Sequence, residues 1–242
     1  MNDVNASGLK TVGTEPYVGE TPQIALGSWL TPNPLFYVRS QFDYPDLDES
    51  SWMLQAASSG GQEITFSLND IRQLPKHTLP VTLECAGNNR VDLNPKAPGN
   101  QFENGAVSNA VWSGTSLNSV LSKMNLSEDV VEILFEGADI GSPAADKGPE
   151  PYLRSLPLDL ARHQDTLLAY EMNGETLPLE HGYPVRLIVP GWYGMAHVKW
   201  LTKITALNKP FSGYFQGEKY VLKYEDGTEK PVQEMQVKSA IT

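Results

Sequence analysis

Cys85 is the only cysteine of the 242-residue sequence, and it lies where a strand is expected to end. Residues 79–85 predict a strand with Cys85 at its carboxyl end, and the Ala-Gly-Asn-Asn sequence that follows predicts a turn. A thiolate is both a soft metal ligand and a nucleophile. Arg90 follows five residues later, and a nearby positive charge lowers the pKa of a thiol. The residue types alone leave Cys85 open as a metal ligand, a catalytic thiol or an inert core residue.

A catalytic thiol would need a histidine base. The sequence contains four histidines, and their spacing pairs none of them with Cys85. They are His77, His163, His181 and His197. With a single cysteine, the chain also cannot form an intramolecular disulfide or a cysteine-rich zinc site.

Basic residues beside apolar segments are the second candidate for chemistry. Arg186 lies in an apolar strand expected over 185–189, and Lys199 directly precedes Trp200. A charge that emerges beside buried chain is costly without an anionic partner. Arginine and lysine are the side chains that hold phosphates and small oxyanions, so these positions indicate a local anion site.

The chain as a whole is acidic, with a formal net charge of −11. This charge argues against a nucleic acid or an anionic membrane as partner, because both require a basic footprint. A small anionic substrate would need a local cluster of Arg or Lys to reverse the sign of the field. Screening makes such a cluster effective, since charges beyond about 8 Å are weakly felt at physiological salt.

The sequence shows neither a run of about 18 apolar residues nor a basic segment followed by an apolar core in its first thirty residues. We therefore expect no membrane span. The chain as given is expected to be cytoplasmic, or periplasmic if a leader has been removed.

The hydrophobic pattern predicts one strand-rich domain of mixed α+β class. A short capped helix is expected at 67–74 before Pro75, and a second helix at 112–124. Further strands are expected at 130–135, 167–172, 185–189 and 198–207, with a glycine-containing loop at 190–196 and hairpin turns at Asn173-Gly174 and Asp226-Gly227. Residues 1–33 are polar and rich in Gly and Pro, which indicates an extended arm or coil preceding a domain at 34–242.

Several stretches, in this order along the chain, resemble the molybdopterin-binding domain shared by sulfite oxidases and plant nitrate reductases. They are LFYVR at 35–39, VTLECAGN at 81–88, GAVS at 105–108, FEGAD at 135–139, LAYEMNG at 168–174, HGYPVR at 181–186 and HVKWL at 197–201. The resemblance implies a molybdenum–molybdopterin cofactor in which Cys85 is the single protein ligand to molybdenum.

The resemblance also implies roles for residues around Cys85. His181, Arg186 and Lys199 match positions that contact the pterin or its phosphate, and Asp139 matches a contact to the pterin ring. Gln41 takes the place of a family histidine that contacts the cofactor. Arg39 and Arg90 match arginines that bind the oxyanion substrate, and Tyr220 matches the active-site tyrosine.

Three departures leave the substrate open. The family commonly has Asn-His after the first arginine, whereas this chain has Ser40-Gln41. Phe102 stands where a tryptophan usually lines the substrate pocket, and Asn89 stands where many sulfite oxidases carry another arginine.

The two ends also differ from the longer family members. Residues 232–242 resemble the segment that leads into an immunoglobulin-like dimerisation domain, so the chain is either a single-domain relative or part of a longer protein. It has neither the length nor the motif for the haem domain of the vertebrate enzymes. We expect electrons to leave to oxygen or to a separate redox protein, and a homodimer is one assembly to test.

The sequence thus predicts a molybdenum–pterin oxidoreductase that transfers an oxygen atom, with sulfite as the expected substrate. One alternative keeps the cofactor and reduces a sulfoxide, nitrate or another oxide. Another alternative is a protein that binds the molybdopterin without turnover.

Overall fold

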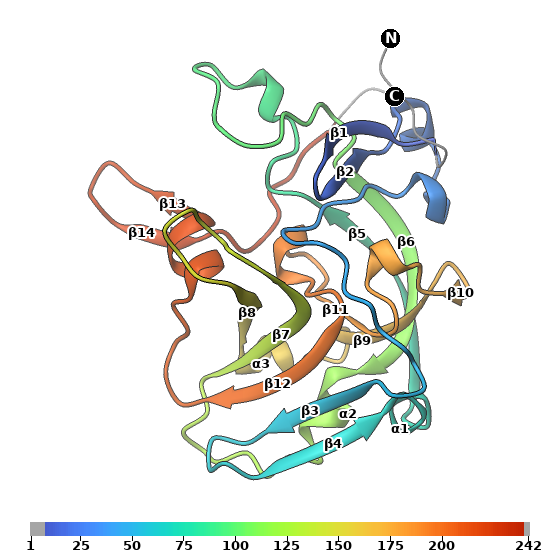
Figure 1. Cartoon of the computed structure of the whole chain (residues 1–242), viewed down its shortest axis with the longest axis vertical. Coiled ribbons are helices and arrows are strands. Elements are labelled where there is room, and N and C mark those ends of the chain that lie inside the picture. Colours follow the sequence, from blue (N-terminus) through green and yellow to red (C-terminus); the bar gives the residue numbers. More distant parts are fainter. Residues whose placement is uncertain (1–7, 240–242) are drawn as a thin grey trace.

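The computed structural model describes residues 8–239, and within them two five-stranded sheets make up most of the fold. Two small hairpins lie beside the sheets (Figure 1), one of β1 (Lys10–Thr14) and β2 (Tyr17–Glu20) and one of β13 (Val221–Lys223) and β14 (Glu229–Pro231). Long strands and short helices confirm the predicted strand-rich α+β domain.

In the first sheet, Cys85 follows the last residue of one strand and lies near the first residue of the strand paired with it. Its strand order is β10-β9-β6-β5, and β11 also pairs with β9. The strands are β5 (Lys76–Glu84), β6 (Val107–Ser116), β9 (Leu167–Met172), β10 (Glu175–Thr176) and β11 (Arg186–Ile188). Lys76 lies opposite Thr115 and Glu84 lies opposite Val107, so β5 and β6 are antiparallel along the whole of β5.

The second sheet has the order β4-β3-β12-β7-β8. Its strands are β3 (Met53–Ala57), β4 (Glu63–Ser67), β7 (Glu132–Gly141), β8 (Glu150–Pro157) and β12 (Leu201–Leu207). The register between β7 and β8 shifts between Glu136 and Ile140. Irregular pairing of this kind redirects side chains, and Asp139 lies within the shifted segment.

The helices are short. They are α1 (Leu68–Arg72), α2 (Leu117–Leu121) and α3 (Leu158–Ala161), the 3₁₀-helices Gln23–Gly27, Asn33–Leu35, Arg90–Asp92, Leu179–His181 and Gly194–Ala196, and a π-helix at Phe215–Lys219. The capped helix predicted before Pro75 is confirmed, because Ser67 and Asp70 form a capping box at the start of α1. None of the described helices is long and apolar enough to cross a membrane.

The helix predicted at 112–124 is wrong in its first part. Trp112 to Ser116 belong to β6, and only residues 117–121 are helical. Hydrogen bonds to β5 on one side and β9 on the other hold this segment extended. Gly114 allows the close approach, since a Cβ there would lie 2.0 Å from the carbonyl oxygen of Leu168.

The amino-terminal segment differs from the expected coil. β1 (Lys10–Thr14) and β2 (Tyr17–Glu20) form a hairpin, and Leu9 and Val18 are buried. Gly19 pairs with Val38, which immediately precedes Arg39. The segment thus packs against the chain that carries one of the predicted site residues, while residues 1–7 of the expected arm lie outside the described residues.

Two predicted hairpins are confirmed. Asn173 (φ 52°) and Gly174 (φ 82°) form the tight turn between β9 and β10, where both residues need the left-handed region. The second hairpin joins β13 (Val221–Lys223) to β14 (Glu229–Pro231), shown in red at the carboxyl-terminal end of the colour scale in Figure 1.

Candidate functional site

Cys85 follows β5 directly and lies at the junction of two neighbouring pockets, here called inner and outer. Arg39, Cys85 and Tyr220 line both of them. The inner pocket is also lined by the predicted residues Gln41, Asp139, His181, Arg186 and Lys199, and the outer pocket by Arg90. The structure therefore brings all the predicted site residues together, although their individual roles stay predictions.

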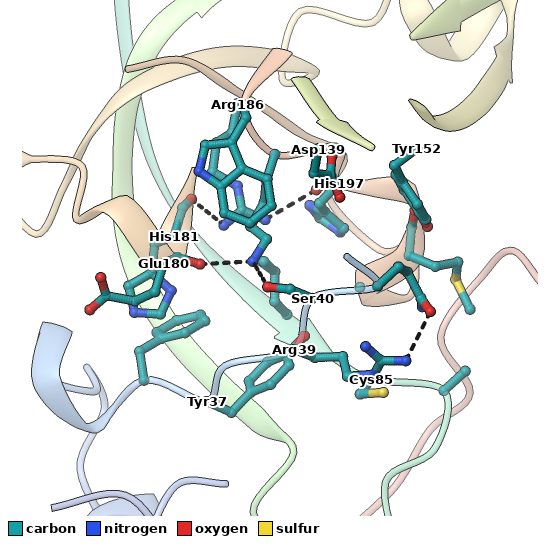
Figure 2. A pocket seen from close by; sticks show the side chains of 18 of the residues that line it. Tyr37, Arg39, Ser40, Cys85, Asp139, Tyr152, Glu180, His181, Arg186 and His197 are labelled. Carbon is teal, nitrogen blue, oxygen red and sulfur yellow. Dashed lines mark hydrogen bonds between the residues drawn. The ribbon is translucent and has the colours of Figure 1, made fainter. Parts of the chain in front are cut away.

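Separate segments deliver these side chains to one place. Arg39 and Gln41 come from the chain after the 3₁₀-helix Asn33–Leu35, and Asp139 comes from β7. His181 ends a 3₁₀-helix, and Arg186 begins β11. Figure 2 shows Cys85 and Arg39 on one side of the inner pocket and Arg186 and His181 on the other.

The thiol of Cys85 is held in its protonated form by burial. Burial raises its pKa, while the amide of Gly87, 3.4 Å from Sγ, and the charges of Arg39 and Arg90 oppose the increase. The lowered pKa expected from the sequence is therefore wrong, because desolvation outweighs the arginines. A thiol held neutral is a weak nucleophile, so the structure gives no support to a poised catalytic thiol at Cys85.

Arg186 is a buried cation whose contacts are incomplete. It is 4% exposed, and its guanidinium donates to the carbonyl oxygens of His181 at 2.7 Å and His197 at 3.2 Å. Its Nε is buried without a partner. Burial lowers the pKa of Arg186 to about 10.

Lys199 approaches the same pocket from the loop before β12. Its Nζ donates to Oγ of Ser40 at 2.6 Å and to the carbonyl oxygen of Glu180 at 2.8 Å, which leaves one N–H of the ammonium for a ligand. Burial and the charge of Arg186 lower the pKa of Lys199.

Trp200, the next residue, has φ 49° and is fully buried. A strained backbone beside a charged pocket residue is typical of a functional site.

Asp139 is the acidic group of the inner pocket. It is 4% exposed, and burial raises its pKa to about 6, although Lys199 partly offsets the increase. Gly137 gives this carboxylate room, because a Cβ there would lie 2.5 Å from Oδ1. A carboxylate in this setting can accept hydrogen bonds from a ligand that carries N–H groups.

His181 and His197 are buried and neutral. Burial and the neighbouring Arg186 lower the pKa of each imidazole to about 3. Nδ1 of His197 accepts from the amide of Val189 at 3.1 Å, so its Nε2 carries the proton and donates to the carbonyl oxygen of Trp192 at 3.0 Å. Both nitrogens of His197 are engaged, so this histidine cannot act as the base of a thiol catalyst.

Gln41, which takes the place of the family's cofactor-binding histidine, hydrogen-bonds to two other predicted site residues. Its Oε1 accepts from Nη2 of Arg39 at 2.9 Å, and its Nε2 donates to the hydroxyl oxygen of Tyr220 at 2.5 Å. Burial raises the pKa of Tyr220, which keeps its hydroxyl protonated. Because this oxygen accepts from Gln41, its own O–H is free to donate into the pocket.

Arg90 is seated between two glycines of the outer pocket. A Cβ on Gly99 would lie 2.5 Å from Nη1 of Arg90, and one on Gly87 would lie 2.9 Å from Nη2. The guanidinium donates to the carbonyl oxygen of Pro98. The two glycines therefore fix where Arg90 can lie.

Two of the residues that depart from the family pattern, Phe102 and Asn89, lie in different places relative to the two pockets. Phe102 lines the outer pocket, as expected for a residue that shapes the substrate site. Asn89 lies outside both pockets and donates to Oδ1 of Asn104 at 2.8 Å. The Asn89 side chain thus lines neither pocket, whereas Phe102 does.

Sequence reasoning missed several lining residues. They are Tyr37, Ser40, Tyr152, Glu180, Met195 and Lys219. Ser40 and Lys219 directly neighbour predicted residues, which was the signal available for them. Tyr152 comes from β8 and its hydroxyl donates to the carbonyl oxygen of Met195 at 2.8 Å, a long-range relationship that local sequence does not reveal.

The charge around Cys85 indicates an anionic ligand. Within residues 8–239, the cations of the two pockets form no ion pair with a carboxylate; they are Arg39, Arg90, Arg186, Lys199 and Lys219. The buried, unpartnered Nε of Arg186 is a further unmet donor. The same described residues hold no group of three or more His, Cys, Asp or Glu side chains placed to bind a metal ion. The unpaired cations thus fit an anionic ligand, and Cys85 is the thiol that lies among them.

Fold and site together define a domain with cation-lined pockets beside a single thiol, and the family comparison gives its class. The family model described as "Oxidoreductase molybdopterin binding domain" matches residues 41–215, and the chain belongs to this family. Its relatives place it among the domains of the sulfite oxidase type, which use a molybdenum–molybdopterin cofactor.

Two curated relatives and one solved structure illustrate the relationship. The chain is 37% identical over 220 residues to mitochondrial sulfite oxidase of Rattus norvegicus, covering 88% of this chain and 39% of the relative. It is 32% identical over 220 residues to nitrate reductase [NADH] 1 of Phaseolus vulgaris, covering 87% and 25%. The sulfane dehydrogenase SoxCD of Paracoccus pantotrophus superposes with a TM-score of 0.79 at 26% identity, covering 92% of this chain and 55% of that one. The chain thus spans well under two thirds of each of these proteins.

Proposed function

We propose that this protein oxidises sulfite to sulfate and passes the electrons to an external acceptor, either oxygen or a separate redox protein. The observation that carries the proposal is the set of unpaired cations around Cys85, which gives an acidic chain a local site for a small dianion. Sulfite oxidases among the relatives support the choice of sulfite.

The residues divide into a cofactor group and a substrate group. Arg186, Lys199 and Asp139 would hold the pterin and its phosphate, and Cys85 would ligate the metal. The molybdenum–pterin cofactor, when bound, supplies the two-electron redox chemistry and the oxygen-atom transfer. Oxidation of sulfite forms one S–O bond, consumes one water overall and releases two protons and two electrons.

Arg39, Arg90 and Tyr220 would bind the substrate on the other side of Cys85. The two guanidinium groups offset the negative charge of the anion and orient it. Gln41 holds the hydroxyl of Tyr220 so that its O–H donates toward the anion. Positioning and electrostatic stabilisation are thus the contribution of the protein.

The test is a titration of purified holoprotein whose molybdenum and pterin contents have been measured. Addition of sulfite should bleach the optical spectrum in one step, and addition of an acceptor should restore it. If nitrate or a sulfoxide instead reoxidises the dithionite-reduced protein while sulfite has no effect, the protein is a reductase, for which the nitrate reductase relative is the precedent. Metal and pterin with no response to any of these reagents would indicate binding without turnover.

A further inference from the structure

Lys219 is a cation of the outer pocket that no family motif singles out. It is the last residue of the π-helix Phe215–Lys219 and directly precedes Tyr220. It lines the outer pocket together with Arg39, Arg90 and Cys85. Lys219 is exposed, but it lines this pocket and hydrogen-bonds to Gln41, unlike a solvated surface lysine.

Gln41 connects Lys219 to the other substrate residues. Its Oε1 accepts from Nζ of Lys219 at 3.1 Å and from Nη2 of Arg39 at 2.9 Å. Its Nε2 donates to the hydroxyl oxygen of Tyr220 at 2.5 Å. One amide group therefore sets the relative positions of two cations and one hydroxyl.

A glutamine at position 41 can accept hydrogen bonds from both Lys219 and Arg39, which a histidine there could not. A neutral imidazole has a single acceptor nitrogen, so a histidine that donates to Tyr220 can accept from only one cation. The carbonyl oxygen of a glutamine has two lone pairs and can accept from both. Gln41 is thus suited to a pocket that contains Lys219 in addition to Arg39.

Lys219 has no anionic partner within the described residues. The adjacent Glu218 is paired with Lys147 at 2.7 Å. The ammonium of Lys219 lies 5.2 Å from the ring centroid of Phe215, which helps to fix its stem. Burial and the charges of Arg39 and Arg90 lower the pKa of Lys219, as expected for cations that face one another without an anion.

We propose that Lys219 is an anion-binding residue of the outer pocket, held in place by Gln41, and that it shares a small tetrahedral or pyramidal oxyanion with Arg39 and Arg90. The inference rests on the proposed function and adds a third cation to its substrate site.

Equilibrium binding of inorganic sulfate to the resting holoprotein tests the inference without turnover. Lys219→Met should weaken sulfate binding about tenfold, the effect of losing one charged hydrogen bond. Lys219→Arg should keep binding within about threefold of the unsubstituted protein. Lys223→Met is the matched control, because Lys223 carries the same charge on the adjacent strand but pairs with Glu229 at 2.9 Å. Unchanged binding in Lys219→Met, or an equal loss in Lys223→Met, would overturn the inference.

The positioning role of Gln41 is tested by a double-mutant cycle. Gln41→His should weaken sulfate binding less in the Lys219→Met background than in the unsubstituted protein, because part of its effect passes through the contact with Lys219. Fully additive losses would show that Gln41 does not act through Lys219.

The outcomes separate this inference from the proposed function. Holoprotein that binds sulfate but is not reduced by sulfite would refute sulfite oxidation, and the Lys219 variants would still decide whether Lys219 binds the anion. Holoprotein that does not bind sulfate at all would overturn the Lys219 inference directly.

Discussion

The guanidinium of Arg186 lies over the indole ring of Trp112, with its central carbon 4.9 Å from the ring centroid. Trp112 is fully buried in β6, and its Nε1 donates to the carbonyl oxygen of Val81 at 3.2 Å. Trp112, a core residue of the first sheet, therefore helps to position the buried guanidinium of Arg186. A desolvated cation–π contact contributes about 2 kcal/mol, less than the cost of burying an unpaired charge. The carbonyl oxygens of His181 and His197 add to this compensation, and an anionic ligand would complete it.

Arg186→Met should remove the cofactor while the protein remains folded. The substitution deletes the buried charge that the phosphate would neutralise, so we expect molybdenum and pterin contents to fall at least about tenfold. Near-ultraviolet circular dichroism and metal analysis of the purified variant provide the measurement. Arg162→Met, at an exposed arginine, is the control and should retain full loading. Full loading of Arg186→Met would contradict a phosphate contact.

Cys85→Ser separates metal ligation from pterin binding. Serine keeps the size of the side chain but replaces a soft thiolate by a hard oxygen, so molybdenum should be lost or bound in an altered form. The pterin contacts of Arg186 and Lys199 remain, so the pterin should be retained better than the metal. Separate assays of molybdenum and of pterin fluorescence check this difference. A variant with normal molybdenum content and normal sulfite oxidation would exclude Cys85 as the ligand.

Local chemistry accounts for the parts of the fold that the sequence predicted. The capping box of Ser67 and Asp70 and the Asn173-Gly174 turn depend on neighbouring residues, and both were predicted correctly. The segment 112–116 was predicted as helix because its apolar spacing is compatible with one. Its strand conformation depends on pairing with β5 and β9, which are distant in the sequence.

The grouping of the site residues also depends on contacts between residues that are distant in the sequence. No spacing rule connects Cys85 to Asp139 or Arg186, and the family resemblance was needed to group them. The pKa of Cys85 also differs from the sequence expectation, because the burial that raises it depends on distant segments and outweighs the nearby arginine. Lys219 was overlooked because a lysine in a polar segment is usually a solvated residue, and its contact with Gln41 spans most of the chain.

Gly99→Ala should impair the substrate site through Arg90. The new methyl group would lie 2.5 Å from Nη1 of Arg90, and the φ of 105° at this position disfavours any side chain. The guanidinium would have to move, so the KM for sulfite should rise about tenfold with a smaller change in kcat. Gly148→Ala is the control, since a Cβ there meets no atom within 4 Å. Equal kinetics for the two variants would show that the position of Arg90 is not set by Gly99.

His197 should make the folded state sensitive to acid. Its pKa is lowered by burial to about 3 in the folded protein, against about 6.5 in an unfolded chain. The stabilisation from a neutral His197 is therefore present above about pH 6.5 and is lost as the pH falls toward 3, because the unfolded state takes up the proton first. Between these limits one histidine contributes a slope of about 1.4 kcal/mol per pH unit to the free energy of unfolding.

His197→Gln tests this dependence, since the amide can still accept from Val189 and donate to Trp192. Urea titrations between about pH 4 and pH 6 should show a free energy of unfolding that falls less steeply with acid than in the unsubstituted protein, by up to about 1.4 kcal/mol per pH unit. Val189→Ala, a core substitution without a titrating group, should lower stability by the same amount at each pH. If His197→Gln leaves the slope unchanged, the imidazole takes up its proton equally well in the folded and unfolded states, and the hydrogen bonds of both ring nitrogens do not hold it neutral.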